Sequence, residues 1–369
     1  PVTSGPMLVG RVRVLAGPDR LPRAQPAAVA AARPPQPRPT FALLPDTDLT
    51  RAFGGVGHVE AERSRALTDW VAHLQAIRHS ADALAAEGLA GGVVTVYAGG
   101  AAAWPSRLTR SPPRWHAGDA AVGLDHDLLA ATAIVYAREG LALIPAFCFD
   151  GAIPALEIIR GGDDATGIAC VGADGRTRRL PGGVHYNILD PRVQRAVEEI
   201  IAEAAARLRG MPGAAGLALV LPHDGWLHLP GVAWGLDDQT FTRFLVAIGG
   251  VAATPEADAG EGRFAERARL VTGDLREEWL AWRTGELTAF YARLTARATA
   301  DEERRQLFVV PTTLLAAGDL AGRFGPTLAA GSDNKDLLRE IGLVAALPAA
   351  GPDQERLVFL APHVHTAAG

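Results

Sequence analysis

Short apolar runs alternate along this chain with segments whose apolar residues recur at helical spacing. The clearest run covers residues 216–221, which are apolar almost without interruption and show no polar residue at alternate positions. This pattern is typical of a parallel strand that is covered on both faces. Further strands are predicted at residues 40–44, 92–98, 141–147, 306–311, 343–347 and 356–361.

Amphipathic helices are predicted between these strands. Apolar residues fall on one helical face in residues 67–77, 125–139, 190–208, 237–248 and 278–298. The expected capping and stop residues are Asp125 and Gly140 for the second helix, Asp190 with Pro191 for the third, and Asp237 or Asp238 for the fourth.

The alternation of strand and helix predicts an α/β fold with parallel strands and right-handed crossovers. No glycine-rich phosphate-binding fingerprint follows the first strand of the repeating pattern, which disfavours a dinucleotide-binding fold. A (β/α)8 barrel of the TIM type is therefore the favoured architecture.

The beginning of the chain has a different character. Residues 8–15 read as a strand, and residues 16–39 are rich in proline, alanine and arginine, a composition typical of a linker. We therefore divide the chain into residues 1–39, the end of a preceding β module with its linker, and residues 40–369, the barrel. Residues 8–15 are expected to lie outside the barrel.

The composition limits the classes of binding partner and cofactor to be expected. A formal charge of −5 over 369 residues gives no reason to expect a nucleic acid, and no run approaches the ~20 apolar residues that span a bilayer. Cys148 and Cys170 are too few for a disulfide framework or a zinc site. His363 and His365, at alternate positions of an extended segment, could share a metal, but no further ligands are evident, and a frayed tail is the favoured interpretation. No metal or cofactor is expected.

Several segments, in order, resemble the glycoside-hydrolase-like family 10 domain, in the form common in large planctomycete proteins. No one of them is specific alone, but together they cover roughly residues 40–283. They are Trp104-Pro105-Ser106, Arg138-Glu139-Gly140-Leu141, Leu143-Ile144-Pro145-Ala146, Ile153-Pro154-Ala155-Leu156-Glu157, Tyr186-Asn187-Ile188-Leu189-Asp190-Pro191-Arg192-Val193-Gln194, Ala215-Gly216-Leu217-Ala218-Leu219, Asp224-Gly225, Leu229-Pro230-Gly231, Trp234-Gly235-Leu236-Asp237-Asp238 and Trp279-Leu280-Ala281-Trp282-Arg283.

The resemblance implies a barrel related to glycosidases, with carbohydrate as substrate and an extracellular or cell-surface location; it brings no established reaction with it. Relatives continue beyond the matched part, which implies a barrel that is incomplete at Gly369. Two departures stand out. Relatives tend to have an aspartate after the second strand, where this chain has Gly99 and Gly100, and a small residue after the third, where it has Asp150.

Asp224 is the first catalytic candidate, because it follows the buried strand at residues 216–221, and ligands bind at the carboxyl ends of strands in such folds. Glycoside hydrolysis needs a second carboxyl group, about 5 to 5.5 Å away for retention and roughly 6.5 to 9.5 Å away for inversion. Asp46, Asp150 and Glu157 compete for that role. The alternatives are an ordinary turn at Asp224 and an ion pair with an arginine at Glu157. Asp237 and Asp238 are assigned to helix capping, with catalysis as a distant second interpretation.

Aromatic residues in the predicted loops offer faces on which sugars could stack. We expect them to line one cleft with Asp224, the alternative being that they close the barrel mouth. The predicted substrate-binding residues are Tyr97, Trp104, Trp115, His223, Trp226 and Trp234. The leading hypothesis is a glycosidase-like enzyme that acts on a polysaccharide or glycoconjugate. The second is a barrel that binds glycans without cleaving them, as a module of a larger surface protein, and a metal-dependent hydrolase is a distant third.

Overall fold

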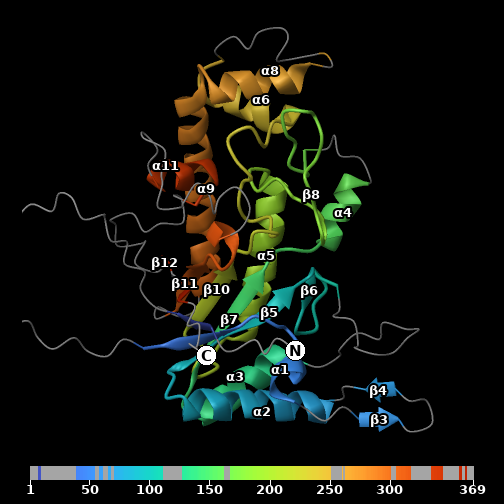
Figure 1. The fold of residues 1–369 in the computed structure, drawn as a ribbon, viewed down its shortest axis with the longest axis vertical. Helices are drawn as coiled ribbons and strands as arrows, with labels where there is room; N and C mark the ends of the chain where they lie inside the picture. The colour runs from blue at the N-terminus through green and yellow to red at the C-terminus, as the bar shows by residue number, and fades with distance from the viewer. Residues whose placement is uncertain are drawn as a thin grey trace, which may run out of the picture.

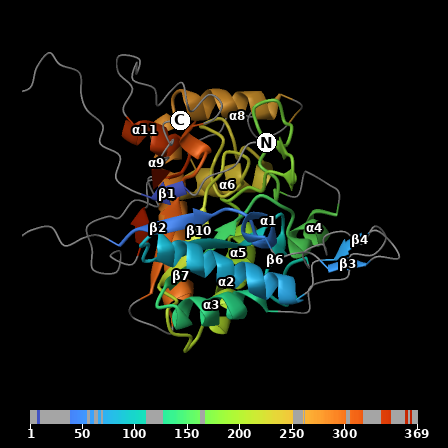
Figure 2. The same ribbon diagram turned by 60° about the horizontal axis from the view of Figure 1, so that its bottom comes forward.

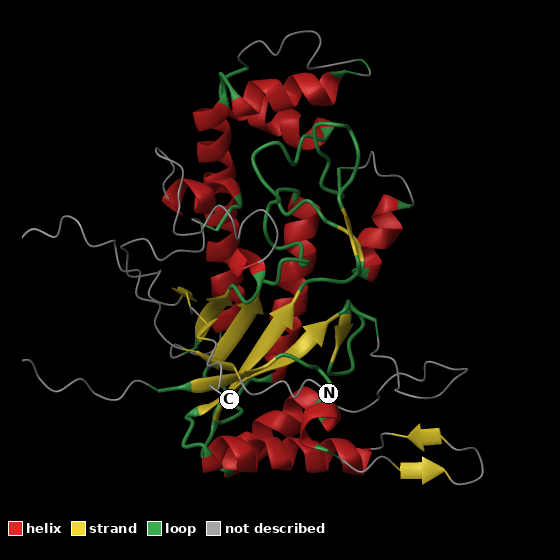
Figure 3. Ribbon diagram, viewed as in Figure 1, coloured by secondary structure: helices red, strands yellow, loops and turns green. Residues whose placement is uncertain are grey.

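The computed structural model describes residues 7–9, 39–54, 58–60, 65–67, 70–110, 127–161, 167–250, 260, 262–300, 305–316, 334–343, 357–359 and 362–363. Within these residues the protein is mixed α/β, with one large sheet and helices around it (Figures 1 and 3). None of the described helices is both long and apolar enough to cross a membrane.

The large sheet contains β1 (Met7–Val9), β2 (Phe41–Leu44), β5 (Gly91–Ala98), β6 (Ala101–Ala102), β7 (Ala142–Cys148), β10 (Gly216–Val220), β11 (Gln306–Val310), β12 (Leu357–Phe359) and β13 (Pro362–His363). Two separate pairs are β3 (His58–Glu60) with β4 (Arg65–Leu67), and β8 (Arg179–Leu180) with β9 (Gly183–Val184). The helices are α1 (Thr50–Phe53), α2 (Trp70–Ala86), α3 (Leu128–Arg138), α4 (Pro154–Arg160), α5 (Pro191–Arg207), α6 (Asp238–Ala247), α8 (Arg263–Thr272), α9 (Arg276–Thr299) and α11 (Asn334–Glu340), with a 3-10 turn, η2 (Leu314–Ala316).

Six strands of the large sheet are parallel and follow one another in chain order. They are β2, β5, β7, β10, β11 and β12, each hydrogen-bonded to the next. The predicted parallel α/β class is therefore confirmed. All five residues of β10 are buried between β7 and β11, as the unbroken apolar run predicted.

Alternate residues of these strands pack into two different cores. Leu217 and Leu219 of β10 belong to a large core shared with the helices, whereas Ala218 and Val220 belong to a second core made by strand residues alone. The members of the second core are Leu43, Val93, Ile144, Ala146, Ala218, Val220, Phe308 and Val310. The sheet thus has one face covered by helices and one face whose side chains pack against other strands.

The first described strand differs from the expectation. β1 pairs antiparallel with β2 on one side and with β13 on the other. We expected residues 8–15 outside the barrel, yet Leu8 and Val9 pair within the large sheet, so this part of the prediction is wrong. The edge of β2 offers free backbone groups, and an apolar segment of high strand propensity satisfies them. Residues 10–38 lie outside the described residues, and the division at residue 39 stays a prediction.

Helices cover the sheet in groups. α2 packs on α3 and on β5, and Figure 2 shows both helices side by side in front of the strands. α5 packs along the long helix α9, and both α6 and α8 contact α9 (Figure 1). The loops that follow β7 and β10 leave the upper end of the sheet in Figure 1, on the side where α6 and α8 lie.

The caps agree with the sequence in part. Asp190 caps α5 with Pro191 in its first turn, and Asp237 caps α6 by accepting from the Thr240 backbone at 2.9 Å. The predicted cap Asp125 is wrong for α3, because Asp127 accepts from the backbone of Ala130 at 2.8 Å and the helix begins after it. Of the strand predicted at residues 343–347, only Leu343 is described, outside any strand.

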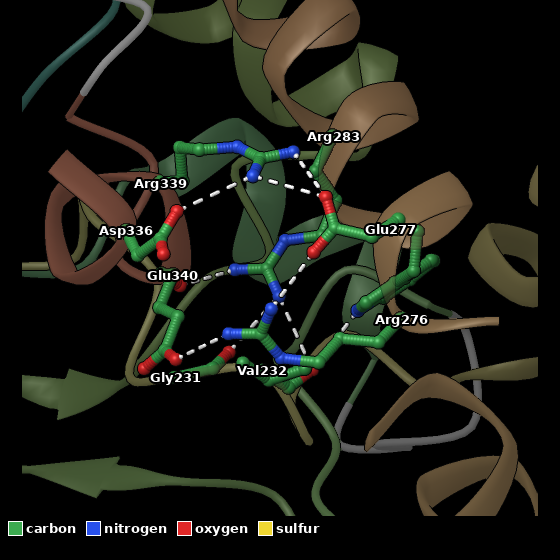
Figure 4. Close-up of polar contacts among 9 residues, drawn as sticks. Gly231, Val232, Arg276, Glu277, Arg283, Asp336, Arg339 and Glu340 are labelled. Carbon is green, nitrogen blue, oxygen red and sulfur yellow. Dashed lines mark hydrogen bonds and ion pairs between the residues drawn. The ribbon is translucent and has the colours of Figure 1, made fainter. Parts of the chain in front are cut away.

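A group of ionised side chains, which we call the α9–α11 cluster, joins α9 to α11 (Figure 4). Its cations are Arg276, Arg283 and Arg339, and its anions are Glu277, Asp336 and Glu340. Arg283 is fully buried and donates to the carbonyls of Gly231 and Val232 at 3.1 Å and of Glu340 at 2.7 Å. Each guanidinium therefore has acceptors, although Nε of Arg283 has none among the described residues.

Candidate functional site at the carboxyl ends of the strands

Two of the predicted carboxylates meet at the ends of neighbouring strands. β7 ends at Cys148, which pairs in register with Val220 of β10, and the two strands run parallel. Asp150 follows two residues after the end of β7 and Asp224 four residues after the end of β10, and neighbouring strands of a sheet lie about 4.8 Å apart. Burial, followed by the charges of Asp150 and Asp224, raises the pKa of the Cys148 thiol, which also donates to Asp150. The thiol therefore marks a point close to both carboxylates.

The two glycines after β5 position Asp150. The backbone N–H of Gly99 donates to the Asp150 carboxylate at 2.6 Å. Gly99 and Gly100 have φ of 61° and 77°, and a Cβ on Gly100 would lie 2.2 Å from the carbonyl oxygen of Ala152. Only glycine fits where the loop after β5 approaches the loop after β7 this closely.

Glu157 is bound in an ion pair. It lies in α4 and accepts from Arg160 at 2.6 Å and from the Tyr186 hydroxyl at 2.5 Å. Hydrogen bonding to Arg160 is the main cause that lowers the pKa of Glu157, so this group is ionised at neutral pH. The contacts match the ion-pair interpretation of this residue rather than a general acid.

Asp46 lies apart from the pair. It follows β2, which is separated from β7 by β5. Its carboxylate accepts from the backbone of Asp48 at 3.0 Å and pairs with Arg51 at 3.4 Å, contacts typical of the start of α1. The structure therefore brings together Asp150 and Asp224 but not Asp46.

Two predicted stacking residues are buried beneath the strand ends. Trp226 is fully buried, donates its indole N–H to the carbonyl of Gly151 at 3.1 Å and packs edge-on against Phe149 and Tyr186. Tyr97 is fully buried, packs on Phe149, and its hydroxyl has no partner among the described residues. Both rings support the floor of the site, and the expectation that they line an open cleft fails because neither is exposed.

Trp104 is anchored to α5. Its indole N–H donates to Glu203 at 3.0 Å, and the Ser106 hydroxyl donates to the same carboxylate. Arg207, one helical turn later, donates to the carbonyl of Pro105 and to Asp127. Trp104 is buried by these contacts, which give the Trp-Pro-Ser segment a structural role.

The remaining predicted residues are more accessible. His223 is exposed and contacts the Thr313 hydroxyl at 3.2 Å, which links the ends of β10 and β11. Trp234 is half-buried, and its ring packs over Gly172. Trp115 lies outside the described residues.

A further group of side chains, which the sequence did not single out, lies beside this site. His185 and His228 are buried, with ring centroids 5.4 Å apart and ring planes at 82°. Arg178 lies opposite His185 when the register of β8 and β9 is continued, and its carbonyl accepts from the His185 backbone at 2.9 Å. We call Arg178, His185 and His228 the hairpin cluster. The only sequence signal was a short arginine-rich hairpin, which resembles an ordinary exposed turn.

The hairpin cluster is next to the carboxylate pair. A Cβ on Gly182, at the turn between β8 and β9, would lie 2.2 Å from the carbonyl oxygen of Asp150. His228 and His223 are close enough for charge on one to disfavour charge on the other, and His223 precedes Asp224. The hairpin therefore lies over the end of β7, and the histidines connect it to the loop after β10.

Asp237, the N-cap of α6, is a further buried acid. Burial raises its pKa to about 6, although Asn187 donates to it at 2.8 Å. Asp238, in contrast, is exposed and pairs with Arg263 and Arg267. Capping accounts for the contacts of Asp237, as the sequence predicted.

No metal centre is evident in the part of the chain that the structure describes, where no three potential ligands converge. His363 lies in β13, and His365 lies outside the described residues, so the predicted pair is not described as a unit. A cavity of about 20 Å³ lies elsewhere, among α2, α3 and β5, with His73 and Thr132 in its wall. It has room for about one water molecule.

No protein-family model and no curated protein matches this chain. Among solved structures, it is similar to α-L-fucosidase isoenzyme 2 from Paenibacillus thiaminolyticus, with 14% identity and a TM-score of 0.36 over 62% of this chain and 28% of that one. A β-galactosidase from Bacillus circulans sp. alkalophilus is 13% identical, with a TM-score of 0.40 over 66% of this chain and 35% of that one. A psychrophilic β-glucosidase from Micrococcus antarcticus is 13% identical, with a TM-score of 0.31 over 84% of this chain and 54% of that one. The chain spans about a quarter to a half of these proteins, and at such scores its function rests on its own residues.

Proposed function

We propose that this protein is a glycosidase-like barrel that acts on a polysaccharide or glycoconjugate through Asp150 and Asp224. One observation carries the proposal: the two carboxylates follow neighbouring parallel strands, and the charges of both act on the same half-buried thiol, Cys148. Strands one step apart in a sheet suit the carboxylate separations of glycoside hydrolysis, about 5 to 10 Å.

The barrel part of the proposal is supported by the two cores and by the ends of the sheet. A strand face that packs only against other strands is typical of a barrel interior. β12 and β13 stand at opposite ends of the hydrogen-bonded order, yet only two residues separate them in sequence. A sheet whose first and last strands are that close along the chain has to curve back towards itself.

The two carboxylates have different surroundings, which suggests different roles. Asp150 accepts from Gly99 and from the thiol, so it is oriented as an acceptor, which suits a nucleophile or base. Asp224 is half-buried and has no hydrogen-bond partner among the described residues, which leaves its carboxyl group accessible to the leaving group of a substrate. We therefore assign the general acid to Asp224.

The departures from relatives are consistent with this arrangement. Relatives tend to carry an aspartate after the strand that corresponds to β5, and this chain has two glycines there. The Gly99 backbone instead receives a carboxylate, Asp150, that comes from the next strand. In the proposed arrangement, Asp150 takes the role of that aspartate and is supplied by the loop after β7.

The test compares Asp150→Asn and Asp224→Asn with the matched control Asp46→Asn on a panel of aryl glycosides and polysaccharides. Each of the first two variants should lower turnover by roughly a hundredfold or more, the scale of losing a general acid or base, while the control changes it less than about twofold. Equal turnover by wild type and Asp224→Asn would exclude Asp224. No turnover by wild type, with glycan binding intact, would instead support a non-catalytic carbohydrate-binding module.

A further inference from the structure

The hairpin cluster is a group of nitrogen-bearing side chains without a carboxylate. The Arg178 side chain is half-buried, and no ion pair or side-chain hydrogen bond involves it within the described residues. Nε2 of His185 and Nδ1 of His228 are buried and equally lack a partner within that part of the chain. Desolvated polar groups without partners are costly, so such a concentration points to a ligand that supplies the missing contacts.

The charges around the cluster indicate whether that ligand is an anion or a cation. The groups that act on His228 are Arg178 and His223, both cations when charged. Arg178 and His228 likewise disfavour charge on His185. No anion of the described residues offsets these effects, and burial and the neighbouring cations lower the pKa of both rings, that of His228 to about 3.

The tautomer of His185 adds a further constraint. Its Nδ1 lies 3.1 Å from the carbonyl oxygen of Tyr186, which can only accept, so Nδ1 carries the hydrogen. In the neutral ring Nε2 is then a bare acceptor, and it becomes a donor only when the ring takes up a proton. An anion bound beside Arg178 would favour protonation of the His185 ring, and Nε2 would then donate a hydrogen bond to that anion.

We infer that Arg178, with His185 and His228 behind it, forms a receptor for an anionic group on the substrate, the carboxylate of a uronic acid or a sulfate ester. The inference rests on the proposed function, because it takes the substrate of the neighbouring carboxylate pair to be an acidic glycan. Arg178 is the member of the cluster that solvent reaches, and its planar guanidinium can bind either group in a bidentate manner.

Binding is tested by isothermal titration with oligosaccharides of several uronic acids, each compared with its carboxyl-reduced form and with a sulfated derivative of that reduced form. The wild type should bind the acidic members about tenfold or more tightly than the reduced ones, the scale of one or two charge-assisted hydrogen bonds. A preference for uronates over sulfated forms, or the reverse, identifies which group the receptor takes. The preference should weaken with added salt and strengthen as the pH falls from 7 to 5.

Arg178→Gln is the decisive variant, and Arg176→Gln is its matched control. Arg176 is exposed on the same hairpin, and its loss changes the net charge equally. Arg178→Gln should bring the affinities for acidic and reduced oligosaccharides within about twofold of each other, and Arg176→Gln should leave the preference intact. Thermal denaturation of both variants checks that they are folded.

Three results would overturn the inference: equal binding of acidic and reduced forms by the wild type, an equal effect of both substitutions, or no binding of acidic members at millimolar concentration. Failure of the proposed function is distinguishable. Acidic glycans that bind but are not cleaved would support the receptor and refute catalysis. Cleavage of neutral glycans without an acidic preference would do the opposite.

Discussion

Two groups of nitrogen-bearing side chains contact the loop that follows β10, and they differ in whether their polar atoms have hydrogen-bond partners. In the α9–α11 cluster every guanidinium has carboxylate or carbonyl acceptors, including the buried Arg283, which binds the carbonyls of Gly231 and Val232 in that loop. In the hairpin cluster, the Arg178 guanidinium, Nε2 of His185 and Nδ1 of His228 have no hydrogen-bond partner among the described residues, although His228 belongs to the same loop. A cluster whose guanidinium groups have acceptors within the protein stabilises one conformation. A cluster whose polar atoms lack partners can still bind a ligand.

The largest effect should follow from removing Arg283. Arg283→Leu removes the guanidinium that donates to two carbonyls of the loop after β10 and to one carbonyl of α11, and we expect the free energy of unfolding to fall by about 3–5 kcal/mol in urea titrations. Arg339→Gln is the control, since its pair with the exposed Glu277 lies near the surface and should contribute less than about 1 kcal/mol. If Arg283→Leu lowers the free energy of unfolding only slightly, water replaces the contacts of Arg283 and the cluster does not stabilise the fold.

A smaller effect should appear with pH in the hairpin cluster. The folded-state pKa of His228 is about 3, below its unfolded value of about 6.5, so the unfolded chain binds a proton that the folded chain does not. Stability from this group is complete above pH 6.5 and is lost as the pH falls. The free-energy difference between wild type and His228→Gln should therefore change by about 2–3 kcal/mol between pH 7 and 4.5. Parallel pH profiles for the two proteins would mean that the ring is already compensated.

The smallest effect is expected for Arg178→Gln. No acceptor among the described residues loses a donor in this variant, so the unfolding free energy at neutral pH should stay within about 0.5 kcal/mol of the wild type. This is the reverse of the result expected for Arg283. A loss above about 1 kcal/mol would show that Arg178 has a partner in the folded protein, and the two clusters would then be alike.

The sequence predicted the features that depend on local pattern. The unbroken apolar run of β10, the cap Asp190 with Pro191 and the cap Asp237 all follow from neighbouring residues, since period and capping are short-range effects. The parallel class followed from the alternation of these elements. The cap of α3 was misplaced by two residues because Asp125 and Asp127 are equivalent in sequence, and only the path of the chain selects one.

The candidate site was predicted less well, because its residues depend on contacts between distant segments. A tryptophan in a loop looks the same whether its ring faces solvent or, like Trp226, is buried against Phe149. Gly99 and Gly100 read as a lost carboxylate, and only the approach of two loops explains them. Arg178 gave no signal, because a missing partner is a property of the folded environment.

The pairing of β1 with β13 has a consequence for how the chain is made. β2, β5, β7, β10, β11 and β12 join the sheet in the order in which a ribosome delivers them, so each new strand finds its partner already present. β1 precedes these strands in sequence, but the register that joins Leu8 to His363 forms only after residue 363 has been synthesised. Throughout translation one edge of β1 is an open hydrogen-bonding surface, the kind of edge that attracts other strands. Until β13 has been made, that edge is therefore a place where a strand of another molecule can pair with β1 in place of β13.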